Sequence, residues 1–117
     1  MTSKRSIPSK DGFQAIFESP DKKFSSNNIL VLCKSNSFDV ARIGVAIRKK
    51  DIKLAVNRNK IKRKIKGSFL AKVLELPVND YVVLVKRDLV GKENDLKKDL
   101  EKIWNKIKAK DDNKSSD

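Results

Sequence analysis

The stretch "AVNRNKIKRKIKGSF", Ala55 to Phe69, predicts a helix with two different sides. Apolar residues recur at every fourth position, at Ile61, Ile65 and Phe69. This spacing gathers them on one side of a helix, where they can pack against other elements. Six of the residues between 58 and 66 are Lys or Arg. We therefore expect a helix from Leu54 or Ala55 to Leu74, with its apolar side docked on a sheet and its cationic side in water.

The cationic side of this helix is not arranged for stability. Asn59, Lys62, Arg63 and Lys66 fall on one face, and no acidic residue is interleaved with the cations. Like charges four residues apart destabilise a helix by about 0.2–0.5 kcal/mol per pair. Gly67, inside the expected helix, adds roughly 1 kcal/mol relative to alanine. The pattern favours an anionic partner.

The flanking segments predict the rest of an α+β domain. A short helix carrying Phe13, Ile16 and Phe17 should end before Pro20. Strands are expected at 28–34, 42–48 and 80–86, and an amphipathic helix after Asn94. In the second strand Gly44 and Ala46 share one face, which leaves room for something to lie across it. We expect one domain over residues 1–110 and a disordered polar tail over 111–117.

Charge narrows the class of partner. The 117 residues include 28 Lys or Arg and 15 Asp or Glu, for a net charge of +13. Residues 42–66 hold eleven basic residues and one acidic residue, so most of the excess is a local patch. Nucleic acid fits this patch best. A membrane surface and a solvated face without a partner are the weaker alternatives.

Other features argue against a protein-based nuclease. The chain has no histidine, so an imidazole acid–base pair is impossible. The aspartates at 39, 51, 80 and 88 are scattered and are expected to be turn or cap residues. Cys33, the single cysteine, and Trp104 are expected in the core. One cysteine and no apolar run of about 18 residues favour a cytoplasmic protein.

The wider stretch "RIGVAIRKKDIKLAVNRNKIKRKIKGSF", Arg42 to Phe69, resembles the signature of the bacterial ribonuclease P protein subunit. That signature has an Arg-Ile/Val-Gly strand, a Lys-Lys pair, and then Arg-Asn followed by Lys-Arg and one further cation. The resemblance covers about residues 7–108. Lys66 and Gly67 depart from it, because the family often has arginine and an acidic residue there. A ribosomal or general RNA-binding module remains the rival reading, since its size and charge would be similar.

The resemblance implies a fold and a function. The fold is a four-stranded sheet with flanking helices and a split βαβ unit with a left-handed crossover, similar to domain 2 of ribosomal protein S5. The function is that of the protein subunit of ribonuclease P, in a 1:1 complex with the catalytic RNA. The complex removes the 5′ leader of precursor tRNA, with Mg²⁺ at the RNA active site and no cofactor or catalytic residue on the protein.

The resemblance also implies two groups of site residues. Those expected to contact the catalytic RNA are Lys49, Lys50, Lys53, Arg58, Asn59, Lys62, Arg63 and Lys66. Those expected to contact the leader are Phe13, Phe17, Leu32 and Arg48. Ordinary core packing is the alternative for the two phenylalanines. Replacing Arg58 or Arg63 by alanine is expected to weaken RNA binding with little loss of fold.

Overall fold

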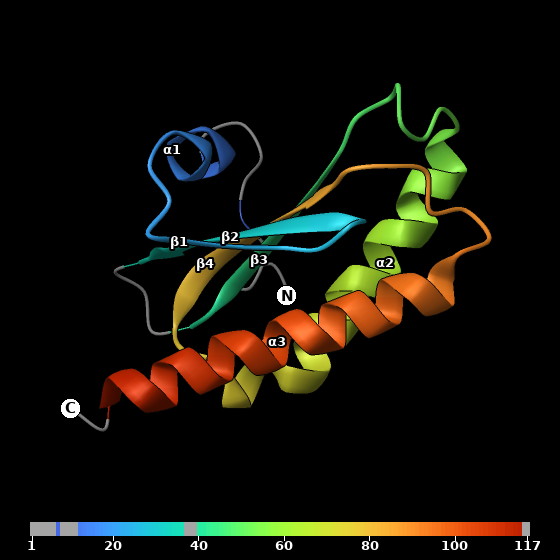
Figure 1. The fold of residues 1–117 in the computed structure, drawn as a ribbon. Coiled ribbons are helices and arrows are strands. Elements are labelled where there is room, and N and C mark those ends of the chain that lie inside the picture. The colour runs from blue at the N-terminus through green and yellow to red at the C-terminus, as the bar shows by residue number, and fades with distance from the viewer. Residues whose placement is uncertain (1–6, 8–11, 37–39, 116–117) are drawn as a thin grey trace.

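The computed structural model describes Ile7 and residues 12–36 and 40–115, and Figure 1 shows the arrangement of their helices and strands. The elements, in chain order, are α1 (Gly12–Glu18), β1 (Lys22–Ser25), β2 (Ile29–Ser35), β3 (Arg42–Ile47), α2 (Ala55–Lys72), the 3₁₀ turn η2 (Val73–Glu75), β4 (Asn79–Val85) and α3 (Glu93–Ser115). The predicted bounds of α2 are therefore confirmed, with its last turn tightened into η2.

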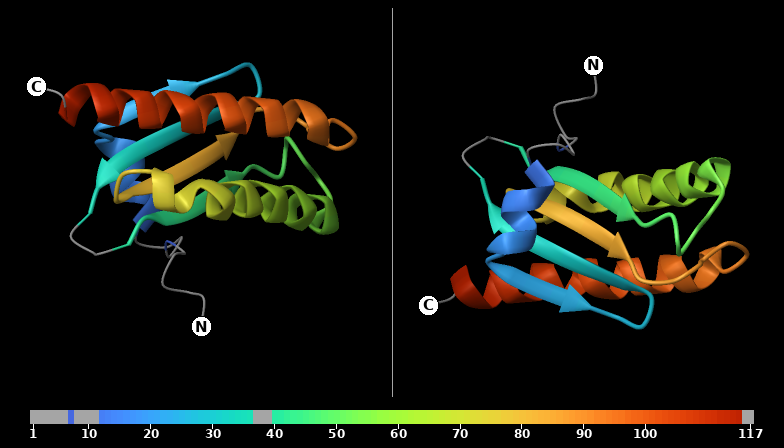
Figure 2. Two further views of the ribbon diagram at one scale, coloured as in Figure 1. Left: turned by 90° about the horizontal axis from the view of Figure 1, so that it is seen from below. Right: turned by 90° about the horizontal axis from the view of Figure 1, so that it is seen from above.

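The four strands form one mixed sheet in the order β1-β2-β4-β3. β1 pairs with β2 and β2 pairs with β4 in antiparallel fashion, whereas β3 and β4 are parallel. This sheet with its flanking helices confirms the predicted α+β class. The strands of the parallel pair are adjacent, so no strand splits the β3–α2–β4 unit. When α2 faces the viewer and both strands point up, β4 lies to the left of β3, which makes the crossover left-handed (Figure 2).

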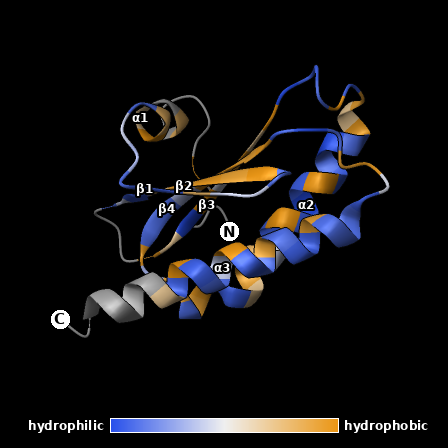
Figure 3. Ribbon diagram, viewed as in Figure 1, coloured by the Kyte–Doolittle hydropathy of each residue, from blue (hydrophilic) through white to orange (hydrophobic). Residues whose placement is uncertain are grey.

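The main core lies between the sheet and the helix pair α2 and α3. Ile61, Ile65 and Phe69 of α2 are fully buried there. The ring centroid of Phe69 lies 5.7 Å from that of Tyr81 and 5.8 Å from that of Trp104. Trp104 is 1% exposed, as predicted, and its Nε1 donates a hydrogen bond to Ser68. Hydrophobic and hydrophilic bands alternate along both helices, as amphipathic packing requires (Figure 3).

Of the three helices in the described residues, α1 alone lies on the opposite face of the sheet, where it crosses one end of the strands (Figures 1 and 2). A small second cluster of Ile7, Ile16, Leu32 and Val82 holds it there. The Ile7 amide also donates to the Ile43 carbonyl at the edge of β3. Because α1 has only seven residues, its position depends on this cluster rather than on its own helical stability.

Two elements differ from the prediction. β1 was not expected, because only Phe24 of its four residues is buried. α3 continues to Ser115 and so enters the stretch 111–117, for which the expected disorder stays a prediction. Helical backbone remains compatible with polar sequence, because a helix satisfies its own backbone hydrogen bonds. The division of the chain at residue 110 stays a prediction.

Candidate nucleic-acid interface

The outer side of α2 presents the predicted cationic face. Asn59 and Arg63 are exposed, and Lys62 and Lys66 are half-buried beside them. Asn59 and Arg63 point away from the buried stripe of Ile61, Ile65 and Phe69, whereas Lys62 and Lys66 lie closer to its border. The structure thus brings these four predicted residues together. Among the described residues, the Arg63 guanidinium makes no hydrogen bond or ion pair, so its fork is available to a phosphate.

Arg58 is held differently. Its Nη1 donates to the carbonyl oxygens of Ile52 and Lys53, at 2.9 Å and 2.8 Å. The N-cap residue, Leu54, has no side-chain cap, so Arg58 fixes the entry of the chain into α2. These two hydrogen bonds argue against the expectation that Arg58 can be removed with little loss of fold, and its effect on stability stays a prediction. The sequence pattern could not reveal this role, because it depends on the path of the preceding loop.

The loop between β3 and α2 extends the cationic surface. Lys49, Lys50 and Lys53 are exposed on it. Arg48 Nε donates to Asp51 Oδ2 at 2.8 Å, and the Asp51 amide donates back to the Arg48 carbonyl. This closed turn contains Lys49 and Lys50, and Lys53 follows it in the loop that leads into α2 (Figure 1). Eight predicted RNA-contacting residues thus lie on one continuous segment of loop and helix.

The cations facing α3 are partly balanced. Lys60 Nζ lies 3.9 Å from Glu93 Oε2 at the start of α3. Hydrogen bonds from the Glu93 and Gly91 amides lower the pKa of Glu93, and the charges of Lys60 and Lys64 lower it further. The helix lacks internal acids, as its sequence shows, but α3 supplies one from outside. The uncompensated charge is therefore concentrated on the outer side of α2.

A second candidate surface lies where α1 crosses the sheet. Phe13 packs directly over Gly44, and a Cβ added there would overlap the Phe13 ring. The small-residue face predicted for β3 is thus occupied by this ring. Phe17 meets Phe13 edge to face, with ring centroids 6.3 Å apart, and remains 43% exposed. The position of Phe13 is therefore explained mainly by packing against the sheet. Phe17, in contrast, presents an exposed aromatic ring to the solvent.

Leu32 faces this side of the sheet but does not reach its surface. It is 3% exposed, in the cluster beneath α1, so its assignment to the leader-contacting group is wrong. The adjacent row across the sheet is Leu30, Leu84 and Ala46, all half-buried. The alternation of strand residues could have found this row, since it lies two residues beyond Leu32 and Gly44. Arg48 comes directly after the end of β3 and is exposed.

Asp51, Asp80 and Asp88 have partners within the protein, and Cys33 is buried. Burial disfavours the charged form of Asp80, but hydrogen bonds from Arg42 and Asn36 outweigh it and lower the pKa of Asp80. Asp51 pairs with Arg48, and Asp88 accepts the Val90 amide in a turn. Asp39 lies outside the described residues. Burial raises the pKa of the Cys33 thiol to about 12, so it is an inert core group as predicted.

Metal-binding and membrane features were sought in the same residues. Within the described part of the chain, no group of three or more His, Cys, Asp or Glu side chains could hold a metal ion. None of the described helices is long and apolar enough to cross a membrane. The features that distinguish this molecule are therefore its cationic helix and its aromatic sheet face.

Comparison with known proteins identifies the family. The family model for ribonuclease P matches residues 1–108. The ribonuclease P protein components of Stutzerimonas stutzeri and Pseudomonas aeruginosa are each 38% identical over 96 residues, which is 81% of this chain and 73% and 71% of theirs. This chain belongs to the ribonuclease P protein family. It is a subunit of the endoribonuclease that processes the 5′ ends of tRNA, and it acts with ribonuclease P RNA and tRNA precursors.

Solved structures agree on the fold. The ribonuclease P protein of Thermotoga maritima superposes with a TM-score of 0.74, at 23% identity, over 87% of this chain and 96% of that one. The Staphylococcus aureus protein gives a TM-score of 0.65 at 27% identity, over 71% of this chain and 75% of that one. The family match also excludes the rival reading of a general RNA-binding module.

Proposed function

We propose that α2 and the β3–α2 loop bind the ribonuclease P RNA, while α1 and the open sheet face hold the 5′ leader of precursor tRNA. The observation that carries this proposal is the separation of the two surfaces. α2 covers one face of the sheet and α1 the other (Figure 1). A single small protein can therefore contact the catalytic RNA and its substrate at the same time.

The RNA-subunit surface consists of Lys49, Lys50, Lys53, Arg58, Asn59, Lys62, Arg63 and Lys66. The lysines act as point charges toward phosphates, and Arg63 can form two parallel hydrogen bonds to one phosphate. Asn59 is exposed and offers both a donor and an acceptor, which suits a 2′-hydroxyl or a base edge. Arg58 contributes mainly by fixing the loop that carries the lysines.

The leader surface combines an aromatic face with a shallow apolar floor. Phe17 supplies the exposed ring, and Phe13 supports it from below. Leu30, Ala46 and Leu84 form the adjoining floor, with Arg48 at its far end. A single strand can be held by stacking and by cations without reading its sequence, which suits leaders of differing sequence.

We further propose that the chemistry belongs to the RNA, with one protein per RNA. Phosphate oxygens are the hard ligands that Mg²⁺ prefers, so the RNA can hold the catalytic ions itself. The protein would supply binding and positioning and no cofactor of its own. A cytoplasmic location suits the single buried thiol and a tRNA substrate.

The test is cleavage of a precursor tRNA at low Mg²⁺ by three samples: matched ribonuclease P RNA alone, this protein alone, and both together. Activity that requires the mixture supports the proposal. Cleavage by the protein alone would place catalytic groups on this chain and overturn it. Native mass spectrometry of the mixture should give the mass of one protein and one RNA, and any other stoichiometry would contradict that part.

A further inference from the structure

One face of α2 is exposed along its whole length. Its members lie three or four residues apart, opposite the buried stripe of Ile61, Ile65 and Phe69, and continue into η2. We call this face the outer ridge, and it consists of Val56, Asn59, Arg63, Gly67, Leu70 and Leu74. Only its middle part, Asn59 and Arg63, belongs to the RNA-contacting group described above.

The ridge becomes apolar beyond Gly67. Leu70 is 53% exposed and Leu74 is 92% exposed. Of the seven large hydrophobic side chains exposed in the described residues, four lie on α2 or within two residues of its ends. Neither leucine contributes to the clusters of buried residues. Exposed apolar area gathered in this way indicates a surface that a partner covers.

Gly67 lies between the polar part of the outer ridge, Asn59 and Arg63, and its apolar part, Leu70 and Leu74. A Cβ added there would meet nothing within 4 Å, so packing within the chain does not require glycine. Glycine inside a helix is nevertheless less stable than alanine. A bare backbone at this position gives the fold no advantage, but it allows a partner to approach the helix more closely.

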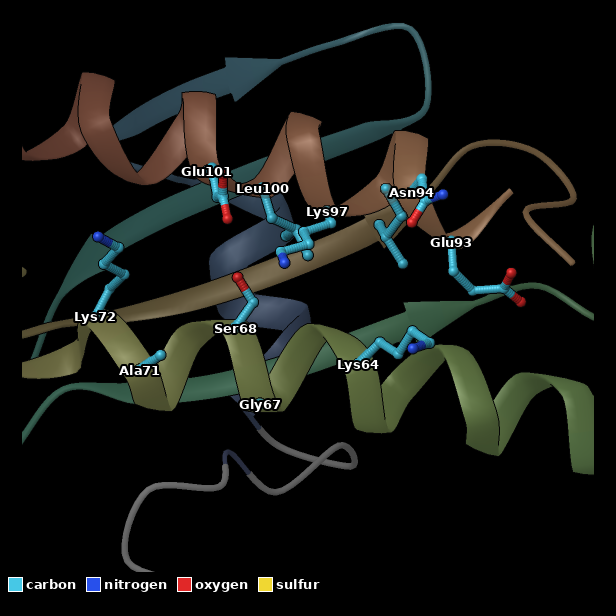
Figure 4. A pocket seen from close by; sticks show the side chains of 11 residues that line it. Lys64, Gly67, Ser68, Ala71, Lys72, Glu93, Asn94, Lys97, Leu100 and Glu101 are labelled. Atoms are coloured by element: carbon cyan, nitrogen blue, oxygen red, sulfur yellow. The ribbon is translucent and has the colours of Figure 1, made fainter. Parts of the chain in front are cut away.

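A groove beside Gly67 indicates the charge of that partner. It measures about 430 Å³ and runs between α2 and α3 (Figure 4). Lys64 and Lys72 stand on its α2 wall, whereas its α3 wall carries Glu93, Lys97 and Glu101, so the α2 wall is the more positive of the two. An anionic partner would therefore lie against α2 and the ridge. A second copy of this chain is disfavoured, since it would bring another net charge of +13 to the same surface.

We propose that the interface with the ribonuclease P RNA continues past the basic motif along the outer ridge. This inference extends the RNA site proposed above and rests on that proposed function. Arg63 and Gly67 are one helical turn apart, about 6 Å along the axis, so one RNA segment can span both. Leu70 and Leu74 pack against ribose and base faces, and the RNA backbone passes close to Gly67. The contacts of the two leucines are apolar and involve no phosphate.

Two variants test the proposal by affinity for the RNA at several salt concentrations and by thermal unfolding of the free protein. Gly67→Ala should raise the melting temperature yet weaken RNA binding. Leu70→Ser combined with Leu74→Ser should weaken binding about tenfold with an unchanged salt slope, because no phosphate contact is lost. Asn105→Ala, on the exposed side of α3, is the matched control: it should also favour helix but leave affinity unchanged.

The outcomes separate this proposal from the one on which it rests. Wild-type affinity in Gly67→Ala and in the double serine variant, with weaker binding by Arg63→Ala, would overturn the extension and keep the basic-helix interface. Failure of the wild-type protein to bind the RNA would overturn both. Sedimentation of the free protein gives a third reading. A dimer that becomes monomeric in the double serine variant would make the ridge a self-association surface and overturn the proposal.

Discussion

Arg58 Nη1 lies 2.8 Å from the carbonyl oxygen of Lys53 and closes the loop that leads into α2. The same nitrogen also donates to the Ile52 carbonyl. Although Arg58 belongs to a strongly basic motif, its guanidinium is used within the protein, where it bonds the backbone of the loop before α2. Its neighbour Arg63, five residues further on, is exposed and lies on the outer side of the same helix. The two arginines should therefore respond differently to substitution.

Arg58→Ala should destabilise the protein by about 1–2 kcal/mol, because two hydrogen bonds from a charged donor are lost. Arg63→Ala should leave the free energy of unfolding unchanged and should reduce the salt slope of RNA binding by roughly 0.7–0.9. Urea unfolding and salt-dependent binding measure the two effects. Arg58→Lys is the informative control, since lysine keeps the charge but lacks the planar guanidinium whose Nη1 makes both hydrogen bonds. Identical urea midpoints for Arg58→Ala and wild type would contradict the anchoring role.

The parts of the fold that could be predicted from the sequence have a clear local pattern of apolar residues, and the parts that could not be predicted lack one. The bounds of α2 followed from a local period of apolar residues, and the burial of Trp104 followed from a similar stripe. β1 was not predicted, because this short edge strand buries only Phe24 and its sequence shows no alternation of apolar and polar residues. The left-handed crossover came from family resemblance alone, since physical preference favours the opposite hand.

The site shows the same division. The shared face of Asn59, Lys62, Arg63 and Lys66 follows from helical geometry and was predicted. The position of Glu93 beside Lys60 was not, because it depends on how α3 packs against α2. Leu32 was assigned to the correct face of the sheet, but strand alternation cannot say which part of that face α1 covers.

Gly44→Ala should destabilise the protein by about 1–3 kcal/mol, because the added methyl group overlaps the Phe13 ring and α1 must move. Gly67→Ala is the matched control: the same substitution meets open space and should stabilise the fold. Thermal unfolding of the pair measures the difference. Equal melting temperatures would show that α1 does not rest on Gly44. Gly44→Ala should also weaken binding of leader-bearing substrate, since Phe17 moves with α1.

Asp80→Asn should destabilise the fold by about 1.5–3 kcal/mol at neutral pH, because the carboxylate accepts two hydrogen bonds from Arg42 and one from Asn36. The pKa of Asp80 is lowered in the folded state. Its contribution is therefore complete above the ordinary aspartate pKa of about 3.9 and is lost as the pH falls through the lowered folded value. Unfolding free energies measured between neutral and acidic pH should converge for variant and wild type. Parallel curves down to the lowest pH would contradict this account.

Phe17→Ala should weaken binding of precursor tRNA by the value of one stacked base, about 1–3 kcal/mol, or roughly 5–150-fold. The fold should be little affected, since the ring is 43% exposed and lies outside the buried clusters. The affinities of the reconstituted complex for leader-bearing and leaderless tRNA show whether Phe17 contacts the leader or another part of the substrate. Loss with the leader-bearing substrate alone places Phe17 against the leader. Equal loss with both substrates would show that the ring acts elsewhere, and wild-type affinity for both would remove Phe17 from the interface.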